Sequence, residues 1–251
     1  MSMKYNNLFQ PLKIGNMEIK NRIVMAPMGI HDNELTKSDG SYTQQGIDYF
    51  VERAKGGAGL IVLGAMQVQN VFERDAHGTS ISTAGQEYVD SMKKFADSIH
   101  EYDCKVVPML TAGTGRQSPF WMVQGEPIAS SDGLPNVWKP EVKHRALTPD
   151  EIKIYIDGFA KGAKLAKDAG FDGISIHAVH EGYLLDQFAI ASMNTRTDQY
   201  GGSVENRLRF VKEIHDAIRE VCGPDFPIMI RYSVTSKMKG FNDGALPGEE
   251  Y

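Results

Sequence analysis

Five short apolar runs, separated by longer amphipathic segments, constrain the fold of this chain more than any other feature of its sequence. The runs lie at residues 23–26, 60–63, 106–110, 173–176 and 227–230. Continuous apolar runs of this length are typical of strands that are covered on both faces of a parallel sheet. Each run is too short for a buried helix. The sequence therefore predicts an α/β fold in which strands and helices alternate.

The segments between the runs have the periodicity and the end signals of helices. Thr148 begins a capping box with proline at the first helical position, and Gly170 marks the end of that helix. Two more helices are expected at about 43–55 and 87–102. Ser203 can cap a further helix, for which we predict an inward face at Leu208, Val211, Ile214 and Ile218.

Alternating strands and helices form either a doubly wound sheet or a (β/α)8 barrel. Gly113 and Gly115 begin a sequence like the dinucleotide-binding G-x-G-x-x-G motif, but the third glycine is missing, and no such motif follows the first run. The doubly wound interpretation therefore loses its main support. We predict an α/β fold of the (β/α)8 TIM-barrel type, with only about the first five strands present in this chain.

The length of the chain fits only part of such a barrel. A complete barrel usually takes about 250 residues, whereas five strand–helix units use all 251 residues here. We therefore expect residues 1–251 to be the N-terminal part of a barrel domain, with the remainder absent; an unusual complete five-stranded fold is the alternative. The segment 117–147 is rich in Pro, Ser, Gly and Trp without a clear period, and a connection of that length is usually a functional lid or ligand loop.

Composition and charge exclude several classes of partner. The net charge of −5 provides no basic surface for nucleic acid or anionic lipid. Two distant cysteines, Cys104 and Cys222, form neither a disulfide framework nor a ligand set for a metal or iron–sulfur cluster. No segment approaches the ~20 apolar residues of a membrane span, and the first residues lack a signal peptide. We predict a cytoplasmic protein without nucleic-acid, membrane or metal partners, and with a homo-oligomer possible.

Polar residues gather where the fourth and fifth runs end. Residues 177–188, HAVHEGYLLDQF, bring two histidines and a tyrosine directly after the fourth run, and Arg231 ends the fifth. Barrel enzymes have their active sites at the C-terminal ends of the strands. An H-x-x-H spacing can bind zinc, but no third ligand is near, and each of these residues alone could be an ordinary core or surface residue. Their expected convergence on one rim favours a functional site.

This stretch, together with the string NTRTDQYGGSVENR at 194–207, resembles the old yellow enzyme family of NADH:flavin oxidoreductases, and the resemblance extends from Leu8 to Arg231. Glu181 lengthens the usual H-x-x-H-G-Y by one residue. In this feature the sequence is most similar to the 2-enoate reductases and bile-acid-pathway flavin reductases of anaerobic bacteria. The resemblance implies a (β/α)8 barrel that holds FMN at its C-terminal rim and is recharged by NADH or NADPH. An iron–sulfur cluster and FAD are expected only in a longer full-length protein.

The resemblance also assigns roles by position. The positions that would contact the flavin are Ala26, Pro27, Met28, Gly29, Ala65, Met109 and Arg231. Most members of the family have a glutamine where Met109 stands, and methionine cannot donate the amide hydrogen bond to the flavin pyrimidine. The positions that would act on the substrate are His177 and His180, which hydrogen-bond its carbonyl, and Tyr183, the proton donor.

The implied reaction needs side chains of these types. Hydride addition to the β-carbon of an enone or enoate leaves negative charge on the carbonyl oxygen, which two imidazole N–H groups can stabilise. A phenol with a pKa of about 10 stays protonated at neutral pH and can donate a proton to the α-carbon. We predict a flavin-dependent ene-reductase that transfers hydride from NAD(P)H through FMN to the C=C bond of an α,β-unsaturated carbonyl or enoate.

The alternative function is a non-catalytic half-barrel or interaction module without a complete flavin site. Many barrels bind phosphate with the loops after strands seven and eight. Five runs leave no room for those loops in this chain. We therefore expect that the polypeptide 1–251 alone does not form a complete flavin site.

Overall fold

A parallel sheet is the central element of the protein, whose computed structural model describes residues 5–30, 34–74, 81–178, 182–232, 237–238 and 242–243. Its five strands are β3 (Val24–Met25), β4 (Leu60–Gln67), β5 (Lys105–Thr111), β9 (Ile174–His177) and β10 (Ile228–Arg231). All neighbouring strands in this sheet pair in parallel. Each of the five apolar runs thus forms a strand, as the sequence predicts.

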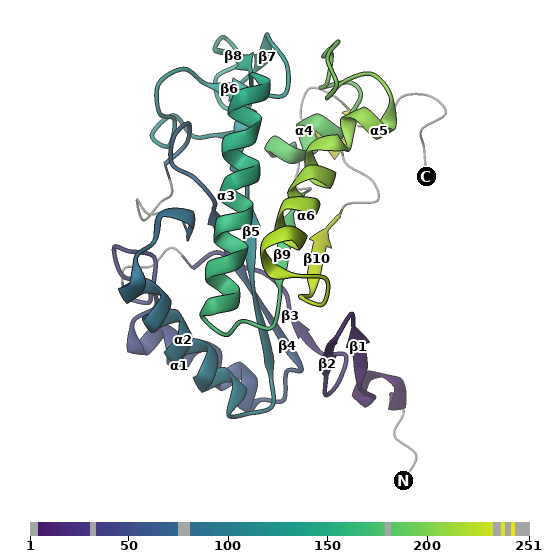
Figure 1. Ribbon diagram of the computed structural model, residues 1–251. Helices are drawn as coiled ribbons and strands as arrows, with labels where there is room; N and C mark the ends of the chain where they lie inside the picture. The colour runs from purple at the N-terminus through teal and green to yellow at the C-terminus, as the bar shows by residue number, and fades with distance from the viewer. Residues whose placement is uncertain are drawn as a thin grey trace.

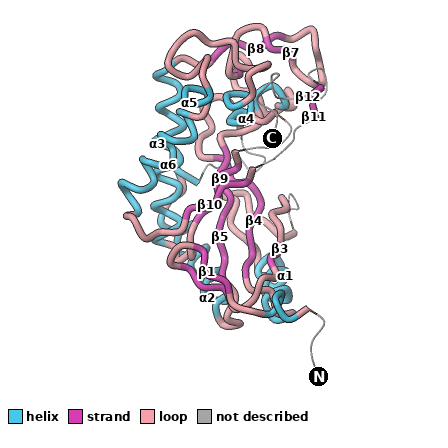
Figure 2. Tube along the Cα trace, turned by 90° about the vertical axis from the view of Figure 1, so that its right-hand side faces the viewer, coloured by secondary structure: helices cyan, strands magenta, loops and turns pink. Residues whose placement is uncertain are grey.

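The order of the strands distinguishes between the two folds that the sequence leaves open. Across the sheet the order is β10-β9-β5-β4-β3, which is simply chain order read from one edge to the other. A doubly wound sheet reverses its order at a switch point, whereas a barrel adds each new strand on the same side. The sheet is therefore of the β/α-barrel type, and its strands run alongside one another in Figure 2.

Helices connect the strands and cover the outer face of the sheet (Figure 1). Those after the first three strands are α1 (Gln44–Lys55), α2 (Gln86–His100) and α3 (Pro149–Asp168), and α6 (Arg209–Cys222) packs beside α3. The predicted capping box is present, because the Thr148 hydroxyl accepts from the Glu151 N–H and the Glu151 carboxylate accepts from the Thr148 N–H. Two short helices, α4 (Leu184–Ala189) and α5 (Val204–Arg207), were not distinguished from the sequence.

The prediction of one helix starting at Ser203 with Leu208 inward is wrong. Ser203 caps only α5, and Leu208 separates α5 from α6 and is 43% exposed. The buried face of α6 carries Phe210, Ile214, Ile218 and Cys222. Leu208 lies six residues before Ile214, which at 100° per residue places it well off that face. The spacing of four from Phe210 onward sets the orientation of the helix.

An N-terminal hairpin, which was not predicted, packs against the inner face of the sheet near the start of β4. It consists of β1 (Leu12–Ile14) and β2 (Met17–Ile19), joined through Gly15 at a φ of 57°. Met17 and Ile19 form one apolar cluster with the inward residues of β4 and β5, which include Leu60 and Val107. The outward residues of the same strands belong to a separate, larger core shared with the helices. Because side chains alternate between the two faces of a strand, β4 and β5 contribute to both cores.

The long segment 117–147, for which the sequence shows no clear period, contains short strands. It contains β6 (Ile128–Ala129), β7 (Leu134–Pro135) and β8 (Lys143–Ala146), which form a three-stranded sheet in the order β6-β8-β7. This small sheet lies beyond one end of the barrel strands, at the top of Figure 1. A separate two-stranded ladder joins β11 (Lys237–Met238) and β12 (Asn242–Asp243).

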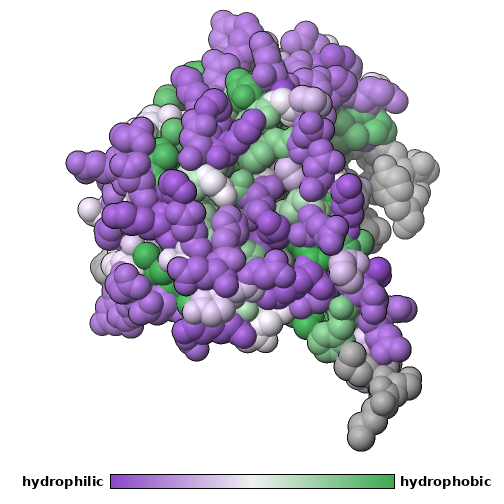
Figure 3. All heavy atoms as spheres, turned by 60° about the horizontal axis from the view of Figure 1, so that its bottom comes forward, coloured by the Kyte–Doolittle hydropathy of each residue, from purple (hydrophilic) through white to green (hydrophobic). Residues whose placement is uncertain are grey.

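The face of the molecule opposite the small sheet is mainly hydrophilic, with apolar side chains only in small groups (Figure 3). Within the described ranges, none of the helices combines the length and the apolar composition that crossing a membrane would require.

Candidate functional site

The inner face of the sheet carries its side chains in layers, as the interior of a β/α barrel does. One layer follows from the strand register, which pairs Ala65 with Met109, Met109 with Ser175, and Ser175 with Met229. Ala65 and Met229 pack against the inner apolar cluster that contains Met109. The predicted flavin positions 65 and 109 therefore lie next to each other, on strands β4 and β5, facing inward.

The next layer toward the carboxyl ends of the strands is polar. Gln67 pairs with Thr111, and Arg231 pairs with His177. Each of these residues lies two positions beyond a member of the layer below and therefore points to the same face. The predicted residues His177 and Arg231 thus lie side by side at one rim. Gln67 and Thr111 were not among the predicted site residues, although alternation from Ala65 and Met109 could have identified them.

His177 and Tyr183 come together in space. Their ring centroids are 5.2 Å apart at an interplanar angle of 70°, an edge-to-face contact. The His177 side chain is enclosed, with 3% exposure and both ring nitrogens buried. Tyr183 is half-buried and is the N-cap residue of α4. His180 lies outside the described residues.

The predicted flavin segment Ala26, Pro27, Met28 and Gly29 follows β3 at the edge of the sheet. Its backbone lies against β4 at Gly64, where a Cβ atom would come within 2.6 Å of the Met28 carbonyl oxygen and 2.7 Å of the Gly29 Cα. Only glycine fits there. Met28 is 55% exposed. The wall between β3 and β4 is therefore made of backbone and small side chains.

Two buried carboxyl groups lie close to the rim. Burial raises the pKa of Asp186 to about 6, against the opposing effect of a hydrogen bond from the Gly182 N–H. Burial also raises the pKa of Glu73 to about 7, opposed by hydrogen bonds from Thr114 and Gly115. Neither carboxyl was predicted as a functional residue, because nothing in the local sequence shows that either is buried.

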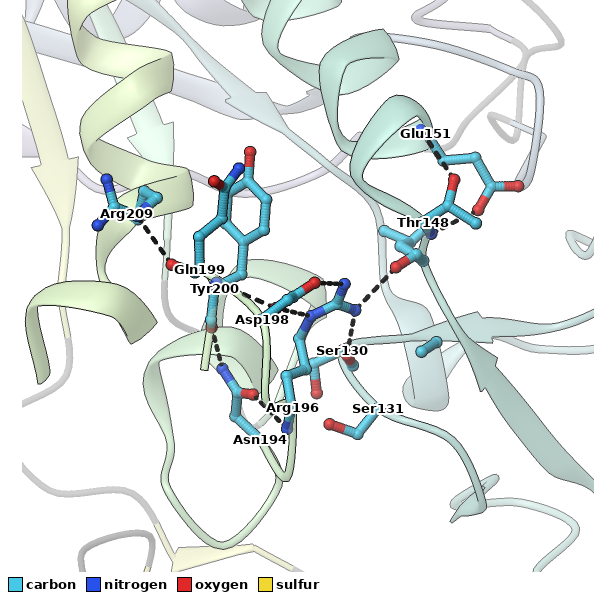
Figure 4. Close-up of polar contacts among 12 residues, drawn as sticks. Ser130, Ser131, Thr148, Glu151, Asn194, Arg196, Asp198, Gln199, Tyr200 and Arg209 are labelled. Atoms are coloured by element: carbon cyan, nitrogen blue, oxygen red, sulfur yellow. Dashed lines mark hydrogen bonds and ion pairs between the residues drawn. The ribbon is translucent and has the colours of Figure 1, made fainter. Parts of the chain in front are cut away.

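The string at 194–207 forms a structural network rather than part of the rim (Figure 4). The Arg196 guanidinium binds both carboxylate oxygens of Asp198, at 3.0 and 2.6 Å, and donates to the carbonyls of Ser130 and Leu147 at 2.9 and 2.7 Å. Asn194 donates to the Tyr200 carbonyl at 2.7 Å. The string therefore fastens the segment 117–147 to the connection between β9 and α6.

The two tryptophans of that segment are not buried. Trp121 is 59% and Trp138 is 68% exposed, and the Trp138 indole N–H donates to the Gln117 carbonyl at 3.0 Å. Among the described residues, no group of three or more His, Cys, Asp or Glu side chains is arranged to hold a metal ion.

A parallel sheet of barrel order with a polar layer at the carboxyl ends of its strands defines a β/α-barrel enzyme architecture. Comparison of the sequence with protein-family models matches residues 7–246 to the NADH:flavin oxidoreductase / NADH oxidase family. The chain belongs to this family of oxidoreductases, as the resemblance implied.

Individual relatives agree with this assignment. The chain is 44% identical over 253 residues to a cinnamate reductase of Clostridium sporogenes, covering all of this chain and 38% of that protein. It is 38% identical over 239 residues to an NADH oxidase of Thermoanaerobacter brockii, covering 95% of this chain and 36% of that protein. The chain thus spans less than two fifths of the length of these two relatives.

Solved structures show the same fold. The old yellow enzyme homologue from Zymomonas mobilis superimposes with a TM-score of 0.79 at 30% identity, over 97% of this chain and 67% of its own. A 2-naphthoyl-CoA reductase in complex with 2-naphthoyl-CoA also gives a TM-score of 0.79, at 29% identity, over 90% of this chain and 35% of its own.

Proposed function

We propose that this protein is a flavin-dependent ene-reductase, which uses NADH or NADPH to reduce the C=C bond of an α,β-unsaturated carbonyl compound or enoate. The observation that carries the proposal is the rim itself, where Arg231 is the strand partner of His177 and the His177 ring contacts that of Tyr183. The 44% identity to a cinnamate reductase supports an aryl enoate as substrate.

The residues present fit an FMN isoalloxazine ring. Because Gly64 has no Cβ atom, the backbone of residues 28–29 packs directly against β4, which brings the proposed flavin segment next to Ala65. Ala65 adds only a methyl group, and Met109 beside it on β5 is buried and apolar. Arg231 supplies a positive charge at the rim, which suits the anionic reduced flavin. When bound there, FMN would supply the hydride, and Ala26, Pro27, Met28 and Gly29 would hold its ring.

The remaining rim residues act on the substrate. The enclosed His177 imidazole offers an N–H to the substrate carbonyl, where negative charge develops, and we assign the same task to His180. Tyr183 holds the proton that the α-carbon receives, and its position as N-cap residue of α4 fixes its backbone. We also propose that residues 1–251 are the N-terminal part of the FMN-binding barrel domain. An iron–sulfur cluster or FAD belongs to a longer full-length protein in this proposal.

The test uses the full-length native protein and two substitutions. We expect a yellow protein that consumes NAD(P)H in the presence of an aryl enoate such as cinnamate. Tyr183→Phe should slow substrate reduction about 100-fold or more, because it removes a general acid, and should leave flavin reduction by NAD(P)H unchanged. His177→Ala should lower substrate reduction by about 100-fold through the lost carbonyl contact.

Tyr49→Phe, on the outer helix α1, is the matched control and should behave as the wild type. A Tyr183→Phe variant with the same rates as Tyr49→Phe would contradict the proposed role of Tyr183 as proton donor. A full-length protein without flavin would contradict the proposal as a whole and would favour a non-catalytic half-barrel.

A further inference from the structure

The sequence Gly113-Thr114-Gly115, which the reaction proposed above leaves unexplained, forms a binding seat for a buried carboxylate from another loop. Glu73, in the loop after β4, is 2% exposed. Its Oε2 accepts from the Thr114 N–H at 2.7 Å and from the Thr114 hydroxyl at 2.9 Å, and its Oε1 accepts from the Gly115 N–H at 2.6 Å. One side chain thus holds the loop after β5 by three hydrogen bonds.

Both glycines are required by this arrangement. Gly113 has a φ of 95°, and a Cβ atom there would lie 2.5 Å from Glu73 Oε2. Gly115 has a φ of 53°, and a Cβ atom there would overlap the Gln187 side-chain nitrogen. The two missing side chains leave the space that Glu73 and Gln187 occupy. The glycine pair therefore joins two other segments of the chain and does not serve as a phosphate loop.

The loop 113–115 also forms hydrogen bonds with the segment that carries Tyr183. The Gly113 carbonyl accepts from the Leu184 N–H at 3.3 Å. The side-chain nitrogen of Gln187, a fully buried residue, donates to the Gly182 carbonyl at 2.6 Å and lies 3.4 Å from the Thr114 carbonyl. The Gln187 N–H in turn donates to the Tyr183 carbonyl at 2.9 Å. The residues before and after Tyr183 are thus linked, directly or through Gln187, to the loop 113–115 that Glu73 holds.

We propose that Glu73 is a positioning residue, which fixes the Tyr183 phenol against His177 by holding the loop 113–115. This inference rests on the proposed function of Tyr183 as proton donor. Glu73 does not touch the substrate; it acts through Thr114, Gly115 and Gln187. Proton transfer depends steeply on the position of the donor, so a loop that shifts when its carboxylate anchor is lost slows this step in particular.

A glutamine in place of Glu73 distinguishes the carboxylate from mere bulk. The amide has the same shape but only one acceptor oxygen, and its NH2 group would face an N–H donor of the loop. Asp172→Asn is the matched control. Asp172 is also a largely buried carboxylate that accepts a backbone N–H, that of Val106 at 2.9 Å, but it lies at the opposite end of β5.

The experiment measures two half-reactions and local hydrogen exchange in the full-length holoprotein. In Glu73→Gln we expect amides of residues 182–188 to exchange about tenfold faster or more. We expect the reoxidation of the reduced protein by cinnamate to slow about tenfold, with a larger solvent isotope effect. Flavin reduction by NAD(P)H should stay within about twofold of the wild type. Asp172→Asn should change neither the exchange at 182–188 nor the reoxidation step.

Thr114→Val, which removes only the hydroxyl bond, should shift the same readouts in the same direction by about fivefold or less. This milder variant keeps the proposal testable if Glu73→Gln does not fold. Unchanged exchange and unchanged reoxidation in the folded variants would overturn the positioning role, even where Tyr183→Phe is impaired. A Tyr183→Phe variant without defect would instead overturn the proposed function, which separates the two failures.

Discussion

Replacing Arg196 with lysine should release the segment 117–147 from the body of the protein. The guanidinium satisfies the carbonyls of Ser130 and Leu147 while it binds both oxygens of Asp198, and its side chain is only 7% exposed. Both carbonyls belong to buried residues. A lysine ammonium is a point charge without the planar fork of arginine and cannot reach all four acceptors at once.

The magnitude follows from the acceptors left behind. A buried polar group that loses its partner costs about 1–3 kcal/mol. With two carbonyls affected and partial compensation by the lysine, we expect a loss of about 2–4 kcal/mol in local stability. That loss corresponds to an opening equilibrium raised by about 30- to 1,000-fold. Hydrogen exchange, followed by mass spectrometry on peptides from residues 128–147, measures this change in a protein of any length.

Arg53→Lys is the control, because Arg53 is exposed on α1 and donates a hydrogen bond to the Tyr49 carbonyl within the same helix. It should change exchange little anywhere. If Arg196→Lys alters exchange in 128–147 no more than Arg53→Lys does, the network of Figure 4 does not hold the segment and the reasoning fails.

Two further predictions concern buried polar side chains. Burial lowers the pKa of His144, which stays neutral with Nδ1 donating to the Ile128 carbonyl. The stability that the neutral ring contributes is complete above its ordinary pKa of 6.5 and is lost as pH falls through the lower folded value, so peptides from 128–147 should exchange faster below about pH 6.5. The same pH dependence in His144→Gln would show that another group is responsible. The Tyr155 hydroxyl is buried without a hydrogen-bond partner among the described residues; Tyr155→Phe should therefore keep the free energy of unfolding or raise it by about 1 kcal/mol, and a clear decrease in urea unfolding would argue against this assignment.

The strands could be predicted because their signal is local. Each apolar run requires burial on both faces, and the sequence around Thr148 contains every group of its capping box, so neither needed knowledge of distant residues. The hairpin of β1 and β2 was missed because its strands are short and only Met17 and Ile19 are buried, against residues far along the chain. The inward face of α6 was misjudged because the break at Leu208 has no marker such as proline or glycine.

Part of the candidate site could likewise be predicted from the sequence, and part depends on contacts between distant residues. His177 and Arg231 could be proposed because they end strands, and strand ends meet at one rim. Tyr183 could be proposed because the motif that contains it resembles that of the family. The string at 194–207 identified the family, but its task as a fastening between loops appears only in three dimensions. Glu73 could not be proposed, because its partners Thr114 and Gly115 lie about 40 residues away and its burial depends on the fold.

The two successive layers on the inner face divide the work of the barrel. Ala65, Met109 and Met229 pack against the apolar interior, whereas the layer one step above is polar. Gln67 and Thr111, the two residues of the polar layer that have no assigned role in the proposed reaction, can therefore change to suit a new substrate, because an altered polar side chain loses little buried hydrocarbon. The apolar layer tolerates only substitutions of similar volume, so changes in substrate specificity are expected in the polar layer rather than in the apolar one.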